Sequence, residues 1–151
     1  MQTLISLVGI ALFILAAYSD VKSFRIPNFL VAAVALLGVT RLIAVGDPSA
    51  AIHTIGASVT ILAVGFVLFW QGLVGGGDAK LMTATALLVG YHNLFSFLVV
   101  MGICGALIAL AALVIHRFPK TRLVVPYGVA IATAGSVTLF FQSPFAISFI
   151  G

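Results

Sequence analysis

Acidic residues are scarce in this chain. Its 151 residues include three aspartates and no glutamate, only 7% of residues are charged, and 63% are hydrophobic. A soluble domain carries about 25% charged residues. No water-soluble core could hide this much apolar surface, which excludes a soluble enzyme or a water-exposed nucleic-acid-binding domain. We therefore expect one polytopic membrane domain over residues 1–151, with the lipid bilayer as a partner and no nucleic acid.

Cysteine is nearly absent as well, because Cys104 is alone and lies inside an apolar run. A single cysteine excludes an intrachain disulfide and a multi-cysteine zinc site. We expect no metal and no cofactor. Basic residues are missing before the first apolar stretch, so residues 1–19 are predicted to be a retained helix and not a cleaved signal peptide.

The apolar runs are long and do not alternate, which predicts helices and not strands. The stretch 80–116 would measure roughly 55 Å as one helix, too long for a single span. Gly90–Asn93 offers a turn that divides it. The tail Gln142–Gly151 is expected to extend the last helix or to lie at the interface. The fold class is thus an all-α bundle of six transmembrane helices with a short fourth helix, near Leu4–Tyr18, Pro27–Val45, Ile52–Gly72, Asp78–Val89, Leu94–Ile115 and Leu123–Phe141.

Basic residues predict the topology. Loops rich in Lys and Arg stay in the cytoplasm, and only Arg41 falls on the other side. Both termini are therefore predicted to be non-cytoplasmic. If the fourth and fifth helices formed one span, Arg117, Lys120 and Arg122 would lie on the non-cytoplasmic side. This favours two helices over the stretch 80–116. The loops after the first, third and fifth helices hold six of the seven basic residues, namely Lys22, Arg25, Lys80, Arg117, Lys120 and Arg122.

Two aspartates are predicted at the cytoplasmic ends of helices, Asp20 at the end of the first and Asp78 at the start of the fourth. Carboxylates near the apolar part of a membrane protein are costly, so each is a functional candidate. Asp47 falls in the opposite loop and is predicted to be a solvated turn residue. Lys22 and Lys80 are predicted to reach toward lipid headgroups.

Two carboxylates in a confined site cannot both ionise easily, so such a pair tends to hold one proton. The ionised group can act as a base on water, while the protonated group polarises a carbonyl and later protonates a leaving amine. This chemistry hydrolyses peptides without a metal. Serine-type catalysis is disfavoured because His53 and His92 fall on the opposite side and His116 is interpreted as a helix-end residue.

Glycines precede the second aspartate, at Gly75, Gly76 and Gly77. They give the backbone a freedom that bulkier residues forbid. The run is either a plain turn between two helices or a place where a substrate strand approaches Asp78.

At these residues the chain resembles the type IV prepilin peptidases, membrane aspartyl proteases with a Gly-x-Gly-Asp motif. The resemblance rests on Asp20 with Ile26-Pro27-Asn28, on residues 75–81, and on a third short motif at residues 126–130. It implies that Asp20 and Asp78 are the catalytic pair. It also implies a substrate-binding or supporting role for Gly75, Gly76, Gly77, Lys80, Pro27, Asn28, Pro126, Tyr127 and Gly128.

The resemblance further implies removal of a short basic leader from prepilins at the cytoplasmic face of the inner membrane. Larger family members carry a domain with paired cysteines and also methylate the new N-terminus. With Cys104 alone, the chain is similar to the short form associated with Flp-type tight-adherence pili, which implies cleavage without methylation. The alternatives are an archaeal preflagellin peptidase, an ion or proton translocator and a non-catalytic pilus-assembly protein. Prepilins are the expected partners, and the oligomeric state is open.

Overall fold

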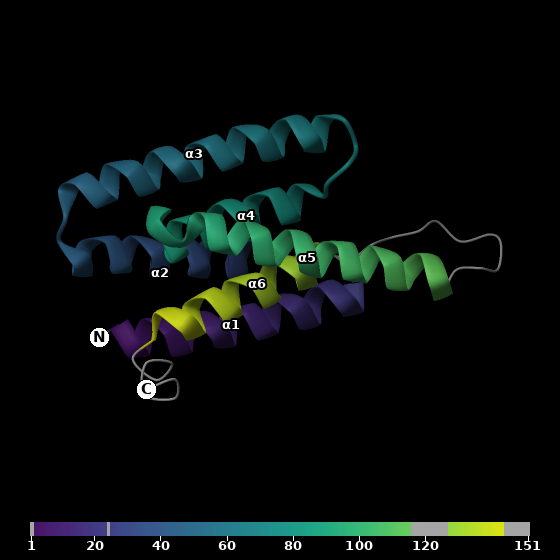
Figure 1. The fold of residues 1–151 in the computed structure, drawn as a ribbon, viewed down its shortest axis with the longest axis horizontal. Helices are drawn as coiled ribbons and strands as arrows, with labels where there is room; N and C mark the ends of the chain where they lie inside the picture. The colour runs from purple at the N-terminus through teal and green to yellow at the C-terminus, as the bar shows by residue number, and fades with distance from the viewer. Residues whose placement is uncertain (1, 24, 116–126, 144–151) are drawn as a thin grey trace.

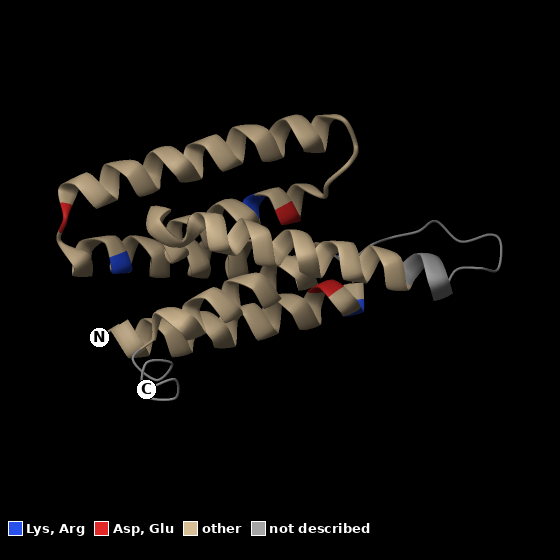
Figure 2. Cartoon of the chain, in the orientation of Figure 1, with Lys and Arg blue, Asp and Glu red and all other residues tan. Residues whose placement is uncertain are grey.

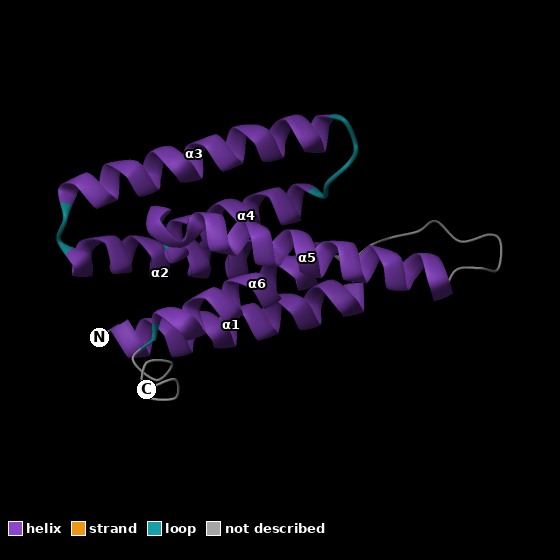
Figure 3. Cartoon of the chain, viewed as in Figure 1, coloured by secondary structure: helices purple, strands orange, loops and turns teal. Residues whose placement is uncertain are grey.

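The computed structural model describes residues 2–23, 25–115 and 127–143, and over these residues every regular element is a helix (Figures 1 and 3). The all-α prediction is confirmed. Four helices, α1, α2, α3 and α5, are long and apolar enough to cross a membrane. The helices run in the order α1 (Gln2–Ser23), α2 (Asn28–Val45), α3 (Pro48–Trp70), α4 (Gly76–Val89), α5 (Tyr91–Ile115) and α6 (Tyr127–Gln142).

Helix α4 lies at the centre of the bundle. It packs against α2, α3, α5 and α6, while α1 runs beside α6 and also contacts α2 (Figure 1). Leu81 and Leu88 of α4 are fully buried, as are Phe13 of α1 and Phe97 of α5. The outward faces of the long helices carry many exposed aliphatic and aromatic side chains, as expected of helices surrounded by lipid.

The start of α3 shows how a local hydrogen bond moves a helix boundary. The helix begins at Pro48, four residues before the predicted Ile52, because the Asp47 carboxylate accepts the backbone N–H groups of Ser49 and Ala50. An aspartate that accepts such bonds is a strong N-cap, and proline fits the first helical position. Asp47 is exposed, as predicted, but it caps a helix and is not simply a turn residue.

Other predicted boundaries were also displaced. Helix α1 continues to Ser23, so Asp20 lies within its last turns and does not terminate it. Gly76 and Gly77 belong to α4 and are not part of a turn. Helix α5 begins at Tyr91, because Gly90 alone, at φ 83°, makes the bend that was predicted over four residues.

Proline 27 precedes α2 as its N-cap and does not form the predicted first turn of that helix. The predicted start of the sixth helix, at 123–126, lies outside the described residues, as do His116, the basic residues 117, 120 and 122, and residues 144–151 of the tail. Gln142, the first residue of that tail, is the last residue of α6.

The predicted short fourth helix is confirmed. The backbone carbonyls at its C-terminal end need hydrogen-bond partners from other helices. Fourteen residues give α4 a length of about 21 Å, against about 30 Å for the hydrocarbon core of a bilayer. The last carbonyls of a helix lack partners within it. The Gln142 amide of α6 donates to the Val89 carbonyl at 3.1 Å and accepts from the Arg41 guanidinium of α2 at 3.3 Å. A cation near a helix C-terminus is also favourable, which explains a basic residue on this side.

Replacing Gln142 by leucine should remove both of these hydrogen bonds. We expect the variant to lose about 1–3 kcal/mol in free energy of unfolding, because a buried carbonyl and a half-buried guanidinium lose their partner. Unfolding of the purified protein in detergent measures this. Gln71→Leu, at the exposed end of α3, is the matched control and should change little. Equal losses in the two variants would contradict the capping role of Gln142.

Candidate active site

The ends of three helices meet at one end of the bundle. Figure 2 shows the acidic positions of α1 and α4 toward the same end, and the acidic position between α2 and α3 at the opposite end. Asp20 near the end of α1 is 4% exposed, and Asp78 in the first turn of α4 is half-buried. The start of α6 completes this region.

The side chain of Ile26 links the three helix ends. A Cβ atom at Gly128 of α6 would lie 2.7 Å from Asp20 Oδ2 and 2.9 Å from Ile26 Cδ1. On the other side, a Cβ atom at Gly77 of α4 would lie 3.5 Å from Ile26 Cβ. Ile26 therefore lies between the residue before Asp78 and the residue that touches Asp20. Two helices that are distant in sequence thus bring their carboxylates to one region.

Two serines hold the turn that presents Ile26. The Ser19 hydroxyl donates to the Arg25 carbonyl at 2.9 Å, and the Ser23 hydroxyl donates to the Ser19 carbonyl at 2.8 Å. Pro27 then adopts extended angles (φ −61°, ψ 135°) and opens α2. The chain is thereby turned back toward the bundle, which leaves Ile26 only 8% exposed.

Each carboxylate faces the start of a helix. The Asp20 carboxylate faces the backbone N–H groups of Gly128 and Val129 at the start of α6, and Asp78 faces the backbone of Gly75, the N-cap of its own helix. Helix N-termini favour negative charge. Even so, no described residue makes a hydrogen bond to Asp20 Oδ2, although this atom is buried. A buried oxygen without a partner is unusual and is suited to accept a proton or bind a water or substrate group.

The two carboxylates also act on each other. Asp20 is close enough to Asp78 for their charges to interact. Both groups are partly or fully removed from water, where such an interaction is stronger than at an open surface. Like charges in such surroundings are costly to keep together.

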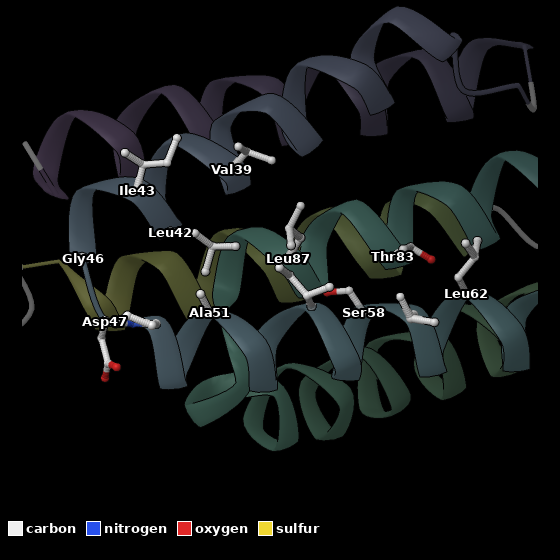
Figure 4. Close-up of a pocket in the computed structure, with 13 residues that line it drawn as sticks. Val39, Leu42, Ile43, Gly46, Asp47, Ala51, Ser58, Leu62, Thr83 and Leu87 are labelled. Atoms are coloured by element: carbon white, nitrogen blue, oxygen red, sulfur yellow. The ribbon is translucent and has the colours of Figure 1, made fainter.

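An apolar cavity of about 210 Å³ adjoins Asp78. Helices α3, α4, α5 and α6 all contribute to its walls, which include Leu68, Met82, Met101, Gly102, Tyr127 and Ile131. A larger groove of about 630 Å³ runs between α2 and α3 over α4, with Asp47 at its end (Figure 4). Neither Asp20 nor Asp78 lines this groove, whereas Asp78 lines the smaller cavity.

Several residues predicted to support the site do adjoin it. A Cβ atom at Gly75 would lie 2.8 Å from Asp78 Oδ2, and one at Gly76 would lie 3.3 Å from the Phe69 ring. A side chain at Gly75 would press on the end of the Asp78 side chain, and one at Gly76 would have to displace the Phe69 ring by a few tenths of an ångström. Tyr127 is 39% exposed and lines the cavity.

Other predicted residues are more remote. Asn28 and Lys80 are exposed and do not line the cavity beside Asp78, and Pro126 lies outside the described residues. Pro27 acts through the backbone, as the cap of α2.

Sequence reasoning missed Ile26 and the cavity as parts of the site. The available signal for Ile26 was its place in the Ile26-Pro27-Asn28 motif, shortly after Asp20 in the sequence. Two glycines of α5 also lie near the site. A Cβ atom at Gly105 would lie 3.9 Å from that of Ala130 in α6. Both Gly102 and Gly105 line the cavity.

The family model for type IV leader peptidases matches residues 7–110, more than half of the chain. The chain belongs to the type IV leader peptidase family. The match includes Asp20 and Asp78 and ends before α6. The predicted family membership is confirmed.

A curated relative gives the same result. The prepilin leader peptidase/N-methyltransferase of Bacillus subtilis (strain 168) is 32% identical over 146 residues, which cover 95% of this chain and 58% of the relative. The chain thus spans little more than half the length of this member of the leader peptidase family. No solved structure matches the chain.

The contact between Gly128 and Asp20 leads to a prediction for Gly128→Ala. The added methyl group would overlap the Asp20 carboxyl and the Ile26 side chain, and we expect overpacking to cost about 1–3 kcal/mol in free energy of unfolding. Gly56→Ala is the matched control, because Gly56 is an exposed helical glycine of α3 with nothing within 4 Å of its Cβ position. Unfolding in detergent should show Gly56→Ala unchanged or slightly stabilised. A Gly128→Ala variant as stable as this control would argue against close packing.

Proposed function

We propose that this chain is a membrane aspartic endopeptidase that removes the short basic leader of prepilins at the cytoplasmic face of the inner membrane. Asp20 and Asp78 are its catalytic residues. The proposal rests on one observation above all: the end of α1 and the start of α4 converge on Ile26 and bring together two of the three carboxylates of the chain. Membership of the leader peptidase family supplies the reaction class.

The two aspartates divide the chemistry between them. The ionised carboxylate takes a proton from a bound water, whose oxygen attacks the carbonyl carbon of the scissile amide. The protonated carboxylate donates a hydrogen bond to the carbonyl oxygen and stabilises the charge that develops there. When the C–N bond breaks, a proton passes to the leaving amine. The products are the carboxylate of the leader and the new N-terminus of the mature protein.

Basic residues support the cytoplasmic location of this site. Lys22 lies in the last turn of α1 beside Asp20, Arg25 follows in the turn to α2, and Lys80 lies one position beyond the first turn of α4. Basic segments stay in the cytoplasm. All six helices then cross or enter the bilayer, with both termini on the far side, as one peptidase domain over residues 1–151. The basic leader is held in the cytoplasm by its own charge, so its scissile bond lies at the depth of the two aspartates.

The neighbouring residues support the pair in different ways. Gly75, Gly76 and Gly77 keep the start of α4 free of side chains, which leaves room for a substrate backbone beside Asp78. Gly128 allows α6 to touch Asp20, and Tyr127 borders the cavity. Pro27 fixes the turn behind Ile26. Roles for Asn28, Lys80 and Pro126 in binding the leader rest on the family resemblance.

We further propose Flp-type prepilins as substrates and cleavage without N-methylation. The relative from B. subtilis is named as both a peptidase and an N-methyltransferase. In this chain the only cysteine is Cys104, which lies in α5. Paired cysteines of the kind expected in the larger family members are thus not part of this sequence. A preflagellin substrate is the alternative that the same experiment distinguishes.

Replacement of either catalytic aspartate by asparagine should abolish processing. Asparagine keeps the shape of the side chain but can neither accept the proton of the water nor share one with its partner. We expect a co-expressed Flp-type prepilin to be shortened by the wild type and to keep its full length with Asp20→Asn or Asp78→Asn. Asp→Glu at either position should lose about 10²-fold in rate, because one extra methylene displaces the carboxylate by about an ångström.

The third aspartate provides a matched control. Asp47→Asn makes the same change far from the site, and asparagine still caps a helix, so processing should be retained. Mass spectrometry of the cleaved product reports whether the new N-terminus is methylated, and a preflagellin tested in parallel separates the two substrate classes. Processing that survives both Asn substitutions at Asp20 and Asp78 would rule out the proposed mechanism.

The topology can be measured with single cysteines in a Cys104→Ser background. Lys22→Cys and Lys80→Cys should react with a membrane-impermeant thiol reagent only from the cytoplasmic side. Ser49→Cys, at the exposed start of α3, should react only from the other side. Labelling of positions 22 and 80 from opposite faces of the membrane would be incompatible with a shared site.

A further inference from the structure

We propose that a phospholipid of the membrane binds between α2 and α3, with an acyl chain in the groove over α4 and its phosphate at Arg41. This site is separate from the proposed cleavage of a substrate, because it opens at the end of the bundle opposite to Asp20 and Asp78 (Figure 2). The protein would therefore hold one lipid in a defined place, in addition to the lipid that surrounds all of its long helices.

The groove itself is almost wholly apolar. It has a volume of about 630 Å³ and lies between α2 and α3, with Thr83 and Leu87 contributed by α4 (Figure 4). The Ser58 and Thr83 hydroxyls also line it, but each donates to a backbone carbonyl of its own helix, that of Thr54 at 2.8 Å and that of Ala79 at 2.9 Å. The groove is thus suited to a hydrocarbon chain and not to a polar ligand.

A polar pocket adjoins the groove at its Asp47 end. The groove and the pocket share Leu42, Asp47 and Ala51. The pocket has a volume of about 80 Å³, and most of the polar side chains that line it come from α2, α3 and the start of α5, namely Arg41, Thr54, Tyr91, His92 and Asn93. An apolar groove that continues into a small polar pocket fits an amphiphile, whose two parts need these two environments.

Arg41 gives this pocket a positive charge. Its guanidinium lies against Gly90, where a Cβ atom would be 2.5 Å from Nη1. Of the five N–H donors of a guanidinium, one is used by the Gln142 amide oxygen. The Asp47 carboxylate caps α3 and points away from the groove (Figure 4). Donors of Arg41 therefore remain for a phosphate, which arginine can bind through two parallel hydrogen bonds.

The length of the groove matches one leaflet of a bilayer. Pro48 and Leu62 both line it and lie fourteen positions apart on α3, which corresponds to about 21 Å. Half of a bilayer, with its headgroups, is about 20–22 Å thick. A lipid with its phosphate at Arg41 can therefore extend its chain along the whole groove. By the proposed topology, this lipid belongs to the non-cytoplasmic leaflet.

The width of the groove favours a lipid over the apolar helix of a substrate. Gly46 and Asp47 alone link α2 to α3, so Val45 and Pro48 are three Cα steps, at most about 11 Å, apart. A helix that lies between two others needs their axes about 16–20 Å apart, twice the usual distance between packed helices. A single hydrocarbon chain needs far less space at this end.

The test measures lipid binding to the full-length protein in detergent, without any substrate. Dioleoyl phosphatidylglycerol and dioleoylglycerol carry the same two acyl chains, but only the first has a phosphate. Wild type should retain one phosphatidylglycerol per protein in native mass spectrometry. It should bind dioleoylglycerol about 10-fold more weakly or less, because that lipid lacks the charged hydrogen bonds to Arg41. Equal binding of the two lipids by wild type would overturn the inference.

Substitution of Arg41 tests the phosphate contact. Arg41→Gln should weaken phosphatidylglycerol binding by about 10-fold, to the level of dioleoylglycerol, and Arg41→Lys should retain part of it, because the charge remains without the planar fork. Arg25→Gln makes the same change in an exposed residue at the other end of the bundle and should bind as wild type does. A folded Arg41→Gln variant that still prefers phosphatidylglycerol as wild type does would contradict the assignment of Arg41.

Substitution of Ala51 tests the groove, and it decides the matter if Arg41→Gln does not fold, as judged by unfolding in detergent. Ala51 lies where the groove and the pocket meet, so Ala51→Phe should abolish retention of both lipids. Ala63→Phe is the matched control, since Ala63 is exposed on α3 and lines neither the groove nor the pocket.

If Ala51→Phe retains phosphatidylglycerol as well as Ala63→Phe does, the inference is overturned. Loss of prepilin processing in that same variant would then identify the substrate as the occupant of the groove. Because lipid binding is measured without substrate, a failure here leaves the proposed function standing. Equally, a protein that holds the lipid but cleaves no prepilin would contradict only the proposed function.

Discussion

The burial of α4 among four other helices is the contact on which the rest of the structure depends. This helix is about 21 Å long, so it cannot reach both surfaces of a bilayer. Its C-terminal end is fixed by the Gln142 amide and the Arg41 guanidinium. Its N-terminal end is fixed by the packing of Gly77 against Ile26. With both ends held, Asp78 has a defined position along the bundle, which the proposed cleavage of a membrane-inserted substrate requires.

Glycines beside the two carboxylates allow the start of a helix to approach each acidic group closely. Gly75 allows the backbone before α4 to come near Asp78, and Gly128 allows α6 to come near Asp20. Each approach directs backbone N–H groups, and the positive end of a helix, at a carboxylate. This offsets part of the cost of removing the charge from water. Glycine at these positions thus allows a favourable electrostatic interaction between a helix N-terminus and a carboxylate, in addition to backbone flexibility.

Sequence reasoning predicted the helical class, the short fourth helix and the family, because apolar runs and short motifs are local signals. It also singled out Asp20 and Asp78, which the structure places at the same end of the bundle. It misplaced helix starts by two to four residues at α3, α4 and α5, since these depend on the Asp47 cap, on packing of Gly76 and Gly77, and on the bend at Gly90. The contact of Gly128 with Asp20 and the pocket beside Asp78 could not be predicted. Both are formed by segments far apart in sequence, and the hydrophobic pattern of the sequence does not predict which distant segments come into contact.

Helix α6 touches functional parts of the molecule at both of its ends. Its first turn meets Asp20 through Gly128, and its last residue, Gln142, holds the far end of α4. An α-helix of this length behaves as a stiff rod, so a shift along its axis cannot be absorbed midway. Any force that pulls Gln142 lengthwise therefore also moves Gly128 against the carboxylate. The cap at the end of α4 and the packing around Asp20 are in this way joined through one helix of sixteen residues.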